Sequence, residues 1–238
     1  MKALDAELDP MSGPRATVGL IVLQSDEVIE HELRCWLPDD IRILHSRIPN
    51  STHVSAETLG AMAHDLPASA RLLPQGIGYA AIAYGCTSAS TVIGEERVGE
   101  LLQSVFPGVP TTNPLTALRA RLENLGMSRI GLLAPYSQTV SKTLLDYLQA
   151  SGIVISHAAT FNESDDTRVA RIGAQSVQAG LLDLGQHKNC EAVFGSCTNL
   201  RSQPFLDAVQ RRLGKPVLTS NSVLAWHLEH LAMEPGSQ

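Results

Sequence analysis

The chain has 238 residues, enough for one large domain or two small ones, with 44% hydrophobic and 18% charged residues. A net charge of −6 and an aromatic content of only 4% argue against a nucleic-acid-binding protein, because phosphates are bound by excess Lys and Arg and bases by stacked aromatic rings. No secretory signal and no membrane-spanning apolar run is visible. We therefore expect a cytoplasmic protein with no nucleic-acid and no membrane partner.

Predicted strands and helices alternate through the first part of the chain. Residues 1–16 are polar and are expected to form a flexible tail. The apolar runs predict strands at 17–23, 41–47, 79–84 and 109–113. The intervening segments predict helices at 27–36, 55–73, 90–105 and 116–125, the second of them divided at Pro67.

The second part of the chain repeats this order. Strands are predicted at 129–134, 153–158 and 191–195 and around Val217. Helices are predicted at 140–151, at 166–184, from Cys197 through Leu213, and at 223–233.

This alternation predicts an α/β fold of two similar halves, each a mostly parallel sheet flanked by helices. The halves are expected to span 17–126 and 127–238, related by a pseudo-twofold axis, with the terminal helix 223–233 as an element that could pack on the first half. The natural active site is the cleft between the halves. The apolar, weakly charged terminal helix also favours a homo-oligomer.

Two Cys-Thr steps recur at corresponding places in the halves. Cys86-Thr87 and Cys197-Thr198 each follow a short apolar strand, and the two cysteines are 111 residues apart. The preceding segments match as well, since Gly19 and Gly131 open similar strands 112 residues apart. Residues suited to starting a helix follow each cysteine, so both thiols are expected on strand-to-helix turns, where open α/β sheets bind their ligands.

The four cysteines show no metal-binding spacing and no disulfide framework, so we expect no metal site. Turn amides and a helix N-terminus favour the thiolate form of cysteine. One thiolate could then take a proton beside a carboxylate or add to an activated double bond, while a neutral thiol opposite returns a proton. Developing negative charge would be held by amides after Cys86 and by the hydroxyls of Thr87, Ser88 and Thr198. This chemistry needs no cofactor.

With these motifs the chain resembles the aspartate/glutamate racemase superfamily, and within it the branch of maleate cis–trans isomerases, arylmalonate decarboxylases and ectoine-utilisation proteins. The resemblance covers nearly everything from Thr17 onward. It implies that Cys86 and Cys197 are the two catalytic cysteines and that Tyr136 and Asn162 bind a substrate carboxylate. Gln24 and Ser25 stand where maleate isomerases place an asparagine, and they are the candidates for binding the other carboxylate in this chain.

The resemblance implies a cofactor-independent isomerase of a small carboxylate, foremost of the maleate type, with Cys86 as nucleophile and Cys197 as acid–base partner. One alternative is a two-base racemase of an amino acid such as aspartate, glutamate or an ectoine-derived diaminobutyrate. A second is an arylmalonate-decarboxylase-like enzyme, for which Cys86 would be dispensable. A third is a non-catalytic small-anion-binding protein, although binding alone needs neither thiol.

Overall fold

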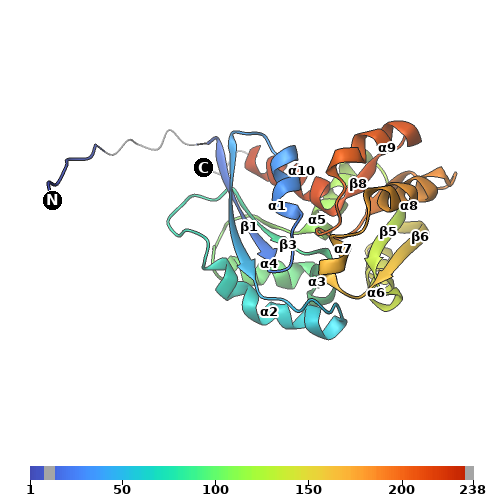
Figure 1. Cartoon of the computed structure of the whole chain (residues 1–238), viewed down its shortest axis with the longest axis horizontal. Helices are drawn as coiled ribbons and strands as arrows, with labels where there is room; N and C mark the ends of the chain where they lie inside the picture. The colour runs from blue at the N-terminus through green and yellow to red at the C-terminus, as the bar shows by residue number, and fades with distance from the viewer. Residues whose placement is uncertain (8–13, 234–238) are drawn as a thin grey trace.

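The computed structural model describes residues 1–7 and 14–233 and contains two four-stranded sheets that lie side by side along the long axis of the molecule (Figure 1). The first sheet has the order β2 (Ile41–Ile48), β1 (Ala16–Leu23), β3 (Ala81–Gly85), β4 (Thr111–Thr112). The second has the matching order β6 (Val154–Glu163), β5 (Arg129–Tyr136), β7 (Ala192–Gly195), β8 (Val217–Thr219). Every pairing within the two sheets is parallel, which confirms the predicted duplicated α/β fold.

The central strands are apolar because helices cover both faces of each sheet. In β1 every residue from Thr17 to Leu23 is buried, and β3 and β7 are buried throughout. Strand β6 lies at the edge of its sheet, and most of its residues are partly or fully exposed. Strands β3 and β7 therefore belong to the buried cores of their sheets up to their carboxyl ends.

Helices fill the connections between strands. The first half has α1 (Ile29–Trp36), α2 (Ala56–Ala70), α3 (Thr87–Ile93), α4 (Glu95–Gln103) and α5 (Pro114–Leu125). The second has α6 (Gln138–Ala150), α7 (Asp166–Val169), α8 (Ala174–Gln186), the 3₁₀ turn η1 (Gln203–Phe205), α9 (Leu206–Leu213) and α10 (Ser220–Met233). Within the described ranges, no helix has the length and apolar character needed to cross a bilayer.

Several predicted helix boundaries were wrong for identifiable local reasons. The helix expected over 90–105 is broken at Gly94, whose φ of 92° leaves the helical region and separates α3 from α4. The helix expected over 166–184 is two helices, α7 and α8. Pro67 does not divide α2, because it lies in the last turn, where only one hydrogen bond of the helix is lost. Of the predicted tail, residues 8–13 lie outside the described residues.

Helix α10 follows the last strand of the second sheet but packs mainly on α5 and α1 of the first half (Figure 1). A buried carboxylate strengthens this crossing. Glu32 of α1 accepts hydrogen bonds from the backbone amides of Ser202 and Gln203, at 2.5 and 2.8 Å, and from the Asn221 side chain of α10 at 2.9 Å. One carboxylate thus fixes both the loop after β7 and the start of α10 to the first half.

A second connection between the halves joins residues 52–54 to residues 164–166. The amide of Val54 donates to the carbonyl of Ser164, and the amide of Asp166 donates to the carbonyl of Thr52, both at 2.9 Å. His53 and Asp165 form an antiparallel bridge between these contacts. The loop after β2 is therefore paired with the segment that leads into α7.

We expect Glu32→Ala to destabilise the fold by about 2–4 kcal/mol, because several buried donors lose their acceptor. Denaturant unfolding would measure the loss. The matched control is Glu30→Ala on the same helix, which removes a half-exposed ion pair with Arg47 and should cost less than about 1 kcal/mol. Equal effects of the two substitutions would show that the Glu32 contacts contribute nothing beyond an exposed ion pair.

Candidate active site

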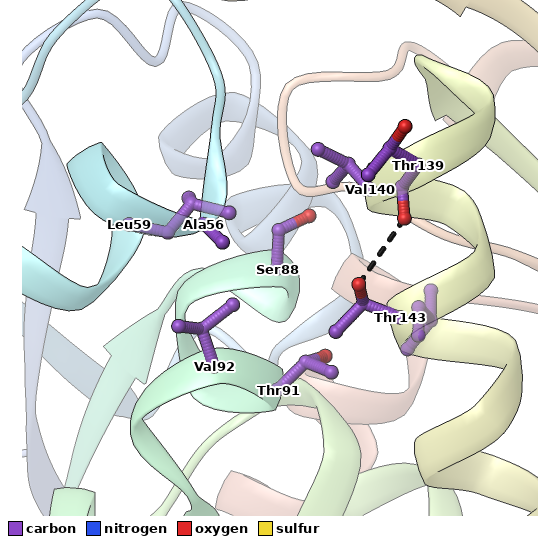
Figure 2. Close-up of a pocket in the computed structure, with 9 residues that line it drawn as sticks. Ala56, Leu59, Ser88, Thr91, Val92, Thr139, Val140 and Thr143 are labelled. Carbon is purple, nitrogen blue, oxygen red and sulfur yellow. Dashed lines mark hydrogen bonds between the residues drawn. The ribbon is translucent and has the colours of Figure 1, made fainter.

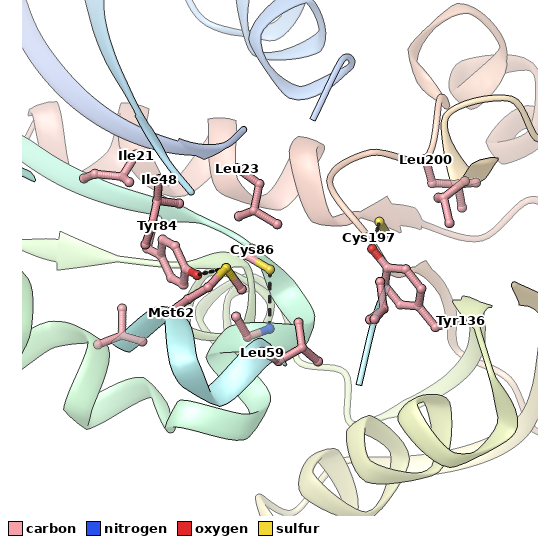
Figure 3. Close-up of a cluster of buried hydrophobic side chains, with 14 of the residues drawn as sticks. Ile21, Leu23, Ile48, Leu59, Met62, Tyr84, Cys86, Tyr136, Cys197 and Leu200 are labelled. Carbon is pink, nitrogen blue, oxygen red and sulfur yellow. Dashed lines mark hydrogen bonds between the residues drawn. The ribbon is translucent and has the colours of Figure 1, made fainter. Parts of the chain in front are cut away.

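Cys86 occupies the junction predicted for it, directly after β3 and at the N-cap of α3. Its sulfur accepts a hydrogen bond from the Ala89 amide at 3.4 Å, and the residue is buried. Figure 3 shows the thiol between Leu23 and Leu59, with the Tyr84 hydroxyl nearby pointing at Met62. The strand end and the first helical turn therefore fix the position of this sulfur.

Cys197 follows β7, but the expected helix does not begin after it. Residues 198–200 form a turn, and helical structure starts only with η1. Cys197 itself has a φ of 97°, a left-handed conformation that residues with side chains rarely adopt and that is often found at functional sites. The Ser220 hydroxyl holds this conformation by accepting a hydrogen bond from the Cys197 amide at 3.0 Å.

Tyr136 and Asp166 form a hydrogen-bonded group beside the Cys197 thiol. Tyr136 ends β5, and its hydroxyl donates to Asp166 Oδ1 at 2.6 Å while lying 3.2 Å from the Cys197 sulfur. The Ser25 hydroxyl from the first half donates to Asp166 Oδ2 at 2.5 Å. Asp166 was not among the predicted site residues, since the sequence marks it only as the first residue of a predicted helix.

These residues border a small cavity between the halves. Ten residues line it, eight from the first half and two from the second: Leu23, Asn50, Ser51, Val54, Thr58, Leu59, Met62, Cys86, Tyr136 and Asp166. Cys197 does not line this cavity, but its sulfur lies against the hydroxyl of Tyr136, which does (Figure 3). The cavity is thus formed where the sequence predicted a site, at strand ends between the halves.

A second, mainly apolar cavity lies between α2, α3 and α6. Ser88 of α3 faces Thr139 and Val140 of α6 across it (Figure 2). Leu59 lines both this cavity and the one that contains Cys86. The Leu59 side chain therefore lies between the cavity that contains Cys86 and this apolar cavity.

The predicted threonine hydroxyls connect the two cysteine turns. The Thr87 hydroxyl lies 2.7 Å from that of Ser220, which also accepts from the Cys197 amide. In the other direction, the Thr198 hydroxyl donates to the carbonyl of Gly85 at 3.2 Å. Both hydroxyls are thus engaged within the protein, and they hold the two turns in a fixed relation.

The remaining predicted binding residues are placed differently from one another. Ser25 is beside the cavity, but its hydroxyl proton is donated to Asp166. Ser88 lines the neighbouring apolar cavity. Gln24 is exposed, and its backbone pairs with β2. Asn162 is exposed near the end of β6, where its side chain accepts from the Gln138 amide of α6 at 3.2 Å. Neither Gln24 nor Asn162 lines the cavity.

Burial makes both thiols weaker acids, contrary to the expectation that helix and turn amides would favour the thiolate. The pKa of Cys86 is raised to about 12, mainly by burial and further by the charges of Asp166 and Asp26, against the opposing hydrogen bond from Ala89. The pKa of Cys197 is raised well above its ordinary value by burial and by the charge of Asp166. Both sulfurs therefore carry protons in the unliganded protein near neutral pH.

The hydrogen-bond directions make Cys197 a proton donor. The Tyr136 hydroxyl has a single proton, and its shorter contact is with the Asp166 carboxylate, which only accepts when ionised. Burial and the neighbouring charge of Asp166 raise the pKa of Tyr136, so this proton stays on the phenol. The Cys197 S–H then donates to the Tyr136 oxygen, in a chain from thiol to phenol to carboxylate.

A second buried carboxylate lies at the start of α1. Asp26 accepts from the amides of Val28 and Ile29 at 2.8 and 2.9 Å. Its pKa is raised to about 6, chiefly by burial, with these hydrogen bonds opposing the shift and the charge of Asp166 adding to it. Among residues 1–7 and 14–233, no three His, Cys, Asp or Glu side chains gather in a way that could hold a metal ion.

The family model described as arylmalonate decarboxylase matches residues 44–237, which is most of the chain and includes both cysteine turns. The chain belongs to the arylmalonate decarboxylase family. A maleate isomerase from Geobacillus stearothermophilus is 25% identical over 217 residues, covering 85% of this chain and 86% of that protein. An arylmalonate decarboxylase from Bordetella bronchiseptica is 27% identical over 130 residues, covering 52% of each.

A solved structure of this fold comes from the Nocardia farcinica maleate cis–trans isomerase. It is 24% identical to this chain, covers 92% of it and 94% of its own length, and superposes with a TM-score of 0.83. It was obtained with a cysteine-to-serine mutant that carries a covalently bound succinylcysteine intermediate.

The raised pKa of Asp26 predicts a stability that falls as the pH rises. The folded protein keeps this proton up to about pH 6, whereas the unfolded chain loses it near 3.8, so ionisation between these values favours unfolding. Asp26→Asn keeps an acceptor for the Val28 and Ile29 amides without the charge. It should stabilise the protein at pH 8 by roughly 1–3 kcal/mol and leave it nearly unchanged at pH 4.

Thermal unfolding at the two pH values would measure this difference. The control is Asp40→Asn, a substitution at an exposed carboxylate paired with Arg15, for which we expect no pH-dependent gain. If Asp26→Asn destabilises the protein equally at pH 4 and pH 8, the buried charge of Asp26 is not what lowers the stability at high pH.

Proposed function

We propose that this protein is a cofactor-independent isomerase, which interconverts the cis and trans forms of a small unsaturated carboxylate through two cysteines, as maleate isomerases do. The observation that carries the proposal is the pair of buried thiols at equivalent strand ends: Cys86 lines the cavity, and Cys197 contacts the hydroxyl of Tyr136, which also lines it. The similarity to maleate isomerases over 85% of the chain supports the same chemistry.

In the proposed reaction the Cys86 thiol first ionises, giving its proton to solvent, and the thiolate sulfur then adds to one alkene carbon as the π bond breaks. Cys197 gives its proton to the neighbouring carbon, which would otherwise carry the negative charge. Rotation about the new single bond exchanges the cis and trans arrangements. Return of that proton to Cys197 and departure of the Cys86 sulfur restore the double bond, so no electrons are gained or lost overall.

The first turn of α3 supports the charged species in this cycle. The Ala89 amide bonds the Cys86 sulfur, and the amide of Ser88 also favours its thiolate form. Amides at a helix N-terminus stabilise negative charge that develops close to them. We assign the substrate carboxylate to the backbone amides of Ser88 and Ala89 beside the Cys86 sulfur, because the hydroxyls of Thr87 and Thr198 are engaged within the protein.

We expect Cys86→Ala and Cys197→Ser to reduce cis–trans conversion by at least about a thousandfold each, because addition and proton transfer each lose their only group. Proton NMR in D2O with maleate and related carboxylates would measure conversion. Mass spectrometry of Cys197→Ser after incubation should show an adduct on Cys86. The matched control is Cys35→Ala, which removes an exposed thiol outside the cavity and should leave the rate unchanged.

Other outcomes would favour the alternatives. Activity that survives Cys86→Ala with release of CO2 from an arylmalonate would indicate a decarboxylase. Exchange of an α-proton of an amino acid without alkene isomerisation would indicate a racemase. Binding of carboxylates without any reaction or adduct would indicate a small-anion-binding protein.

The raised pKa of Cys86 predicts that the rate of isomerisation increases with pH. The thiolate is the nucleophile and the pKa of Cys86 is about 12, so kcat/KM should rise about tenfold per pH unit from pH 7 to 9.5. No falling limb is expected in this range, since Cys197, with its pKa raised well above the ordinary value, stays protonated. A plateau below pH 8 would show that the Cys86 thiol is far more acidic than its burial implies.

We propose further that the enzyme acts in the cytoplasm as a homo-oligomer, with its halves divided as 17–126 and 127–238. Free thiols, one of them exposed at Cys35, support a reducing compartment. The chain leaves the last helix of the first half at Gly126 and enters β5 at Arg129, which supports the proposed division.

A further inference from the structure

A buried carboxylate of the protein itself occupies one end of the cavity. Asp166 is only 2% exposed and lines the cavity together with Cys86 and Tyr136. Its charge acts on both sulfur atoms, since it raises the pKa of Cys86 and of Cys197. The carboxylate therefore lies within electrostatic reach of both reacting groups.

The donors at this end of the cavity are already bonded to that carboxylate. Tyr136 and Ser25 give their only hydroxyl protons to Asp166, at 2.6 and 2.5 Å. The Asn50 amide group donates to the Ser25 oxygen at 2.8 Å and to the Ser51 carbonyl at 3.0 Å. A carboxylate of the chain thus holds the tyrosine hydroxyl that the family resemblance assigns to a substrate carboxylate.

No cation among the described lining residues offsets the charge of Asp166, because none of them is Lys, Arg or His. Arg47 donates to the carbonyls of Leu23 and Asp26 and pairs with Glu30, outside the lining. A second buried acid, Asp26, adds to the negative potential felt by both thiols. A substrate carboxylate placed beside Asp166 would meet like charge in a poorly solvated site, which disfavours binding.

Asp166 has room for one more donor. A carboxylate offers about four acceptor positions. Tyr136 uses one and Ser25 a second, and the Asn199 amide group reaches Oδ2 at 3.3 Å. A hydrogen-bond donor on the substrate would occupy the remaining acceptor position of this buried carboxylate.

We propose that the substrate carries one carboxylate and, at the end that meets Asp166, a hydrogen-bond-donating amide or ammonium group in place of the second carboxylate of maleate. This inference rests on the proposed isomerase function and specifies its substrate class. The bond changes are those already given, because Cys86 adds to an alkene that the remaining carboxylate activates, and Cys197 protonates the adjacent carbon. The nearby donor group takes no part in the covalent steps.

The test compares three cis alkenes as substrates: maleate, its monoamide maleamate, and cis-4-aminobut-2-enoate, which carries an ammonium group. Conversion to the trans isomers is followed by proton NMR. For the wild-type protein we expect kcat/KM for at least one donor substrate to exceed that for maleate by about tenfold or more. The better of the two donor substrates identifies the group as an amide or an ammonium. A preference for maleate over both would overturn the proposal.

Asp166→Asn removes the charge and supplies an amide donor at the same position, so it should reverse the preference toward maleate. The matched control is Asp165→Asn, which removes the same charge from the adjacent residue, outside the cavity, and retains a good helix cap for α7. We expect the control to keep the wild-type preference. If Asp166→Asn lowers kcat/KM for all three substrates by the same factor, Asp166 has a purely structural role and the proposal is wrong.

Binding of unreactive analogues to the wild-type protein tests the recognition by Asp166 independently of the proposed isomerisation, and it needs no variant. Calorimetric titration with the unreactive analogues succinate, succinamate and 4-aminobutanoate should show tighter binding of a donor-bearing ligand than of succinate. If that order is found but no alkene is isomerised and no Cys86 adduct forms, the isomerase function fails while the recognition by Asp166 stands. If succinate binds tightest, the recognition is wrong whatever the reaction.

Discussion

The active site depends on the set of hydrogen bonds that converge on the Asp166 carboxylate. They join the first half, through Ser25, to the second half, through Tyr136, and they determine which way the Cys197 proton points. A buried charge is tolerated only where such donors surround it. The same contacts therefore stabilise the interface of the halves and define the polarity of the cavity between them.

A thiol enzyme needs its sulfur atoms held in place and able to ionise, and burial favours the first but opposes the second. It positions each sulfur within a strand-end turn, yet it removes the water that would stabilise a thiolate, so both cysteines are neutral at rest. For Cys197 this suits a proton donor. For Cys86 it means that the reactive form is scarce and is supported mainly by amides of α3.

The connections between the halves leave little freedom at the reacting groups. The hydroxyls of Thr87 and Thr198 tie each cysteine turn to the other half, and Glu32 fixes the loop after β7 and the start of α10 to α1. Such contacts fix two sulfur atoms that come from different sheets, and the proposed reaction needs this because catalysis gains from holding reacting groups in place. The two threonine hydroxyls that were predicted to bind substrate form hydrogen bonds within the protein and hold the two cysteine turns together.

The sequence by itself determined the duplicated α/β fold and the location of both cysteines, because buried parallel strands and their repeated Cys-Thr endings are local patterns. The hydrophobic pattern of the sequence did not predict the helix break at Gly94 or the turn after Cys197. Each depends on the backbone conformation of a single residue. Only the tertiary structure revealed Asp166, which lies 30 residues from Tyr136 and 141 from Ser25 in the chain. It likewise decided the protonation of the thiols, since burial and neighbouring charges arise only when distant segments pack together.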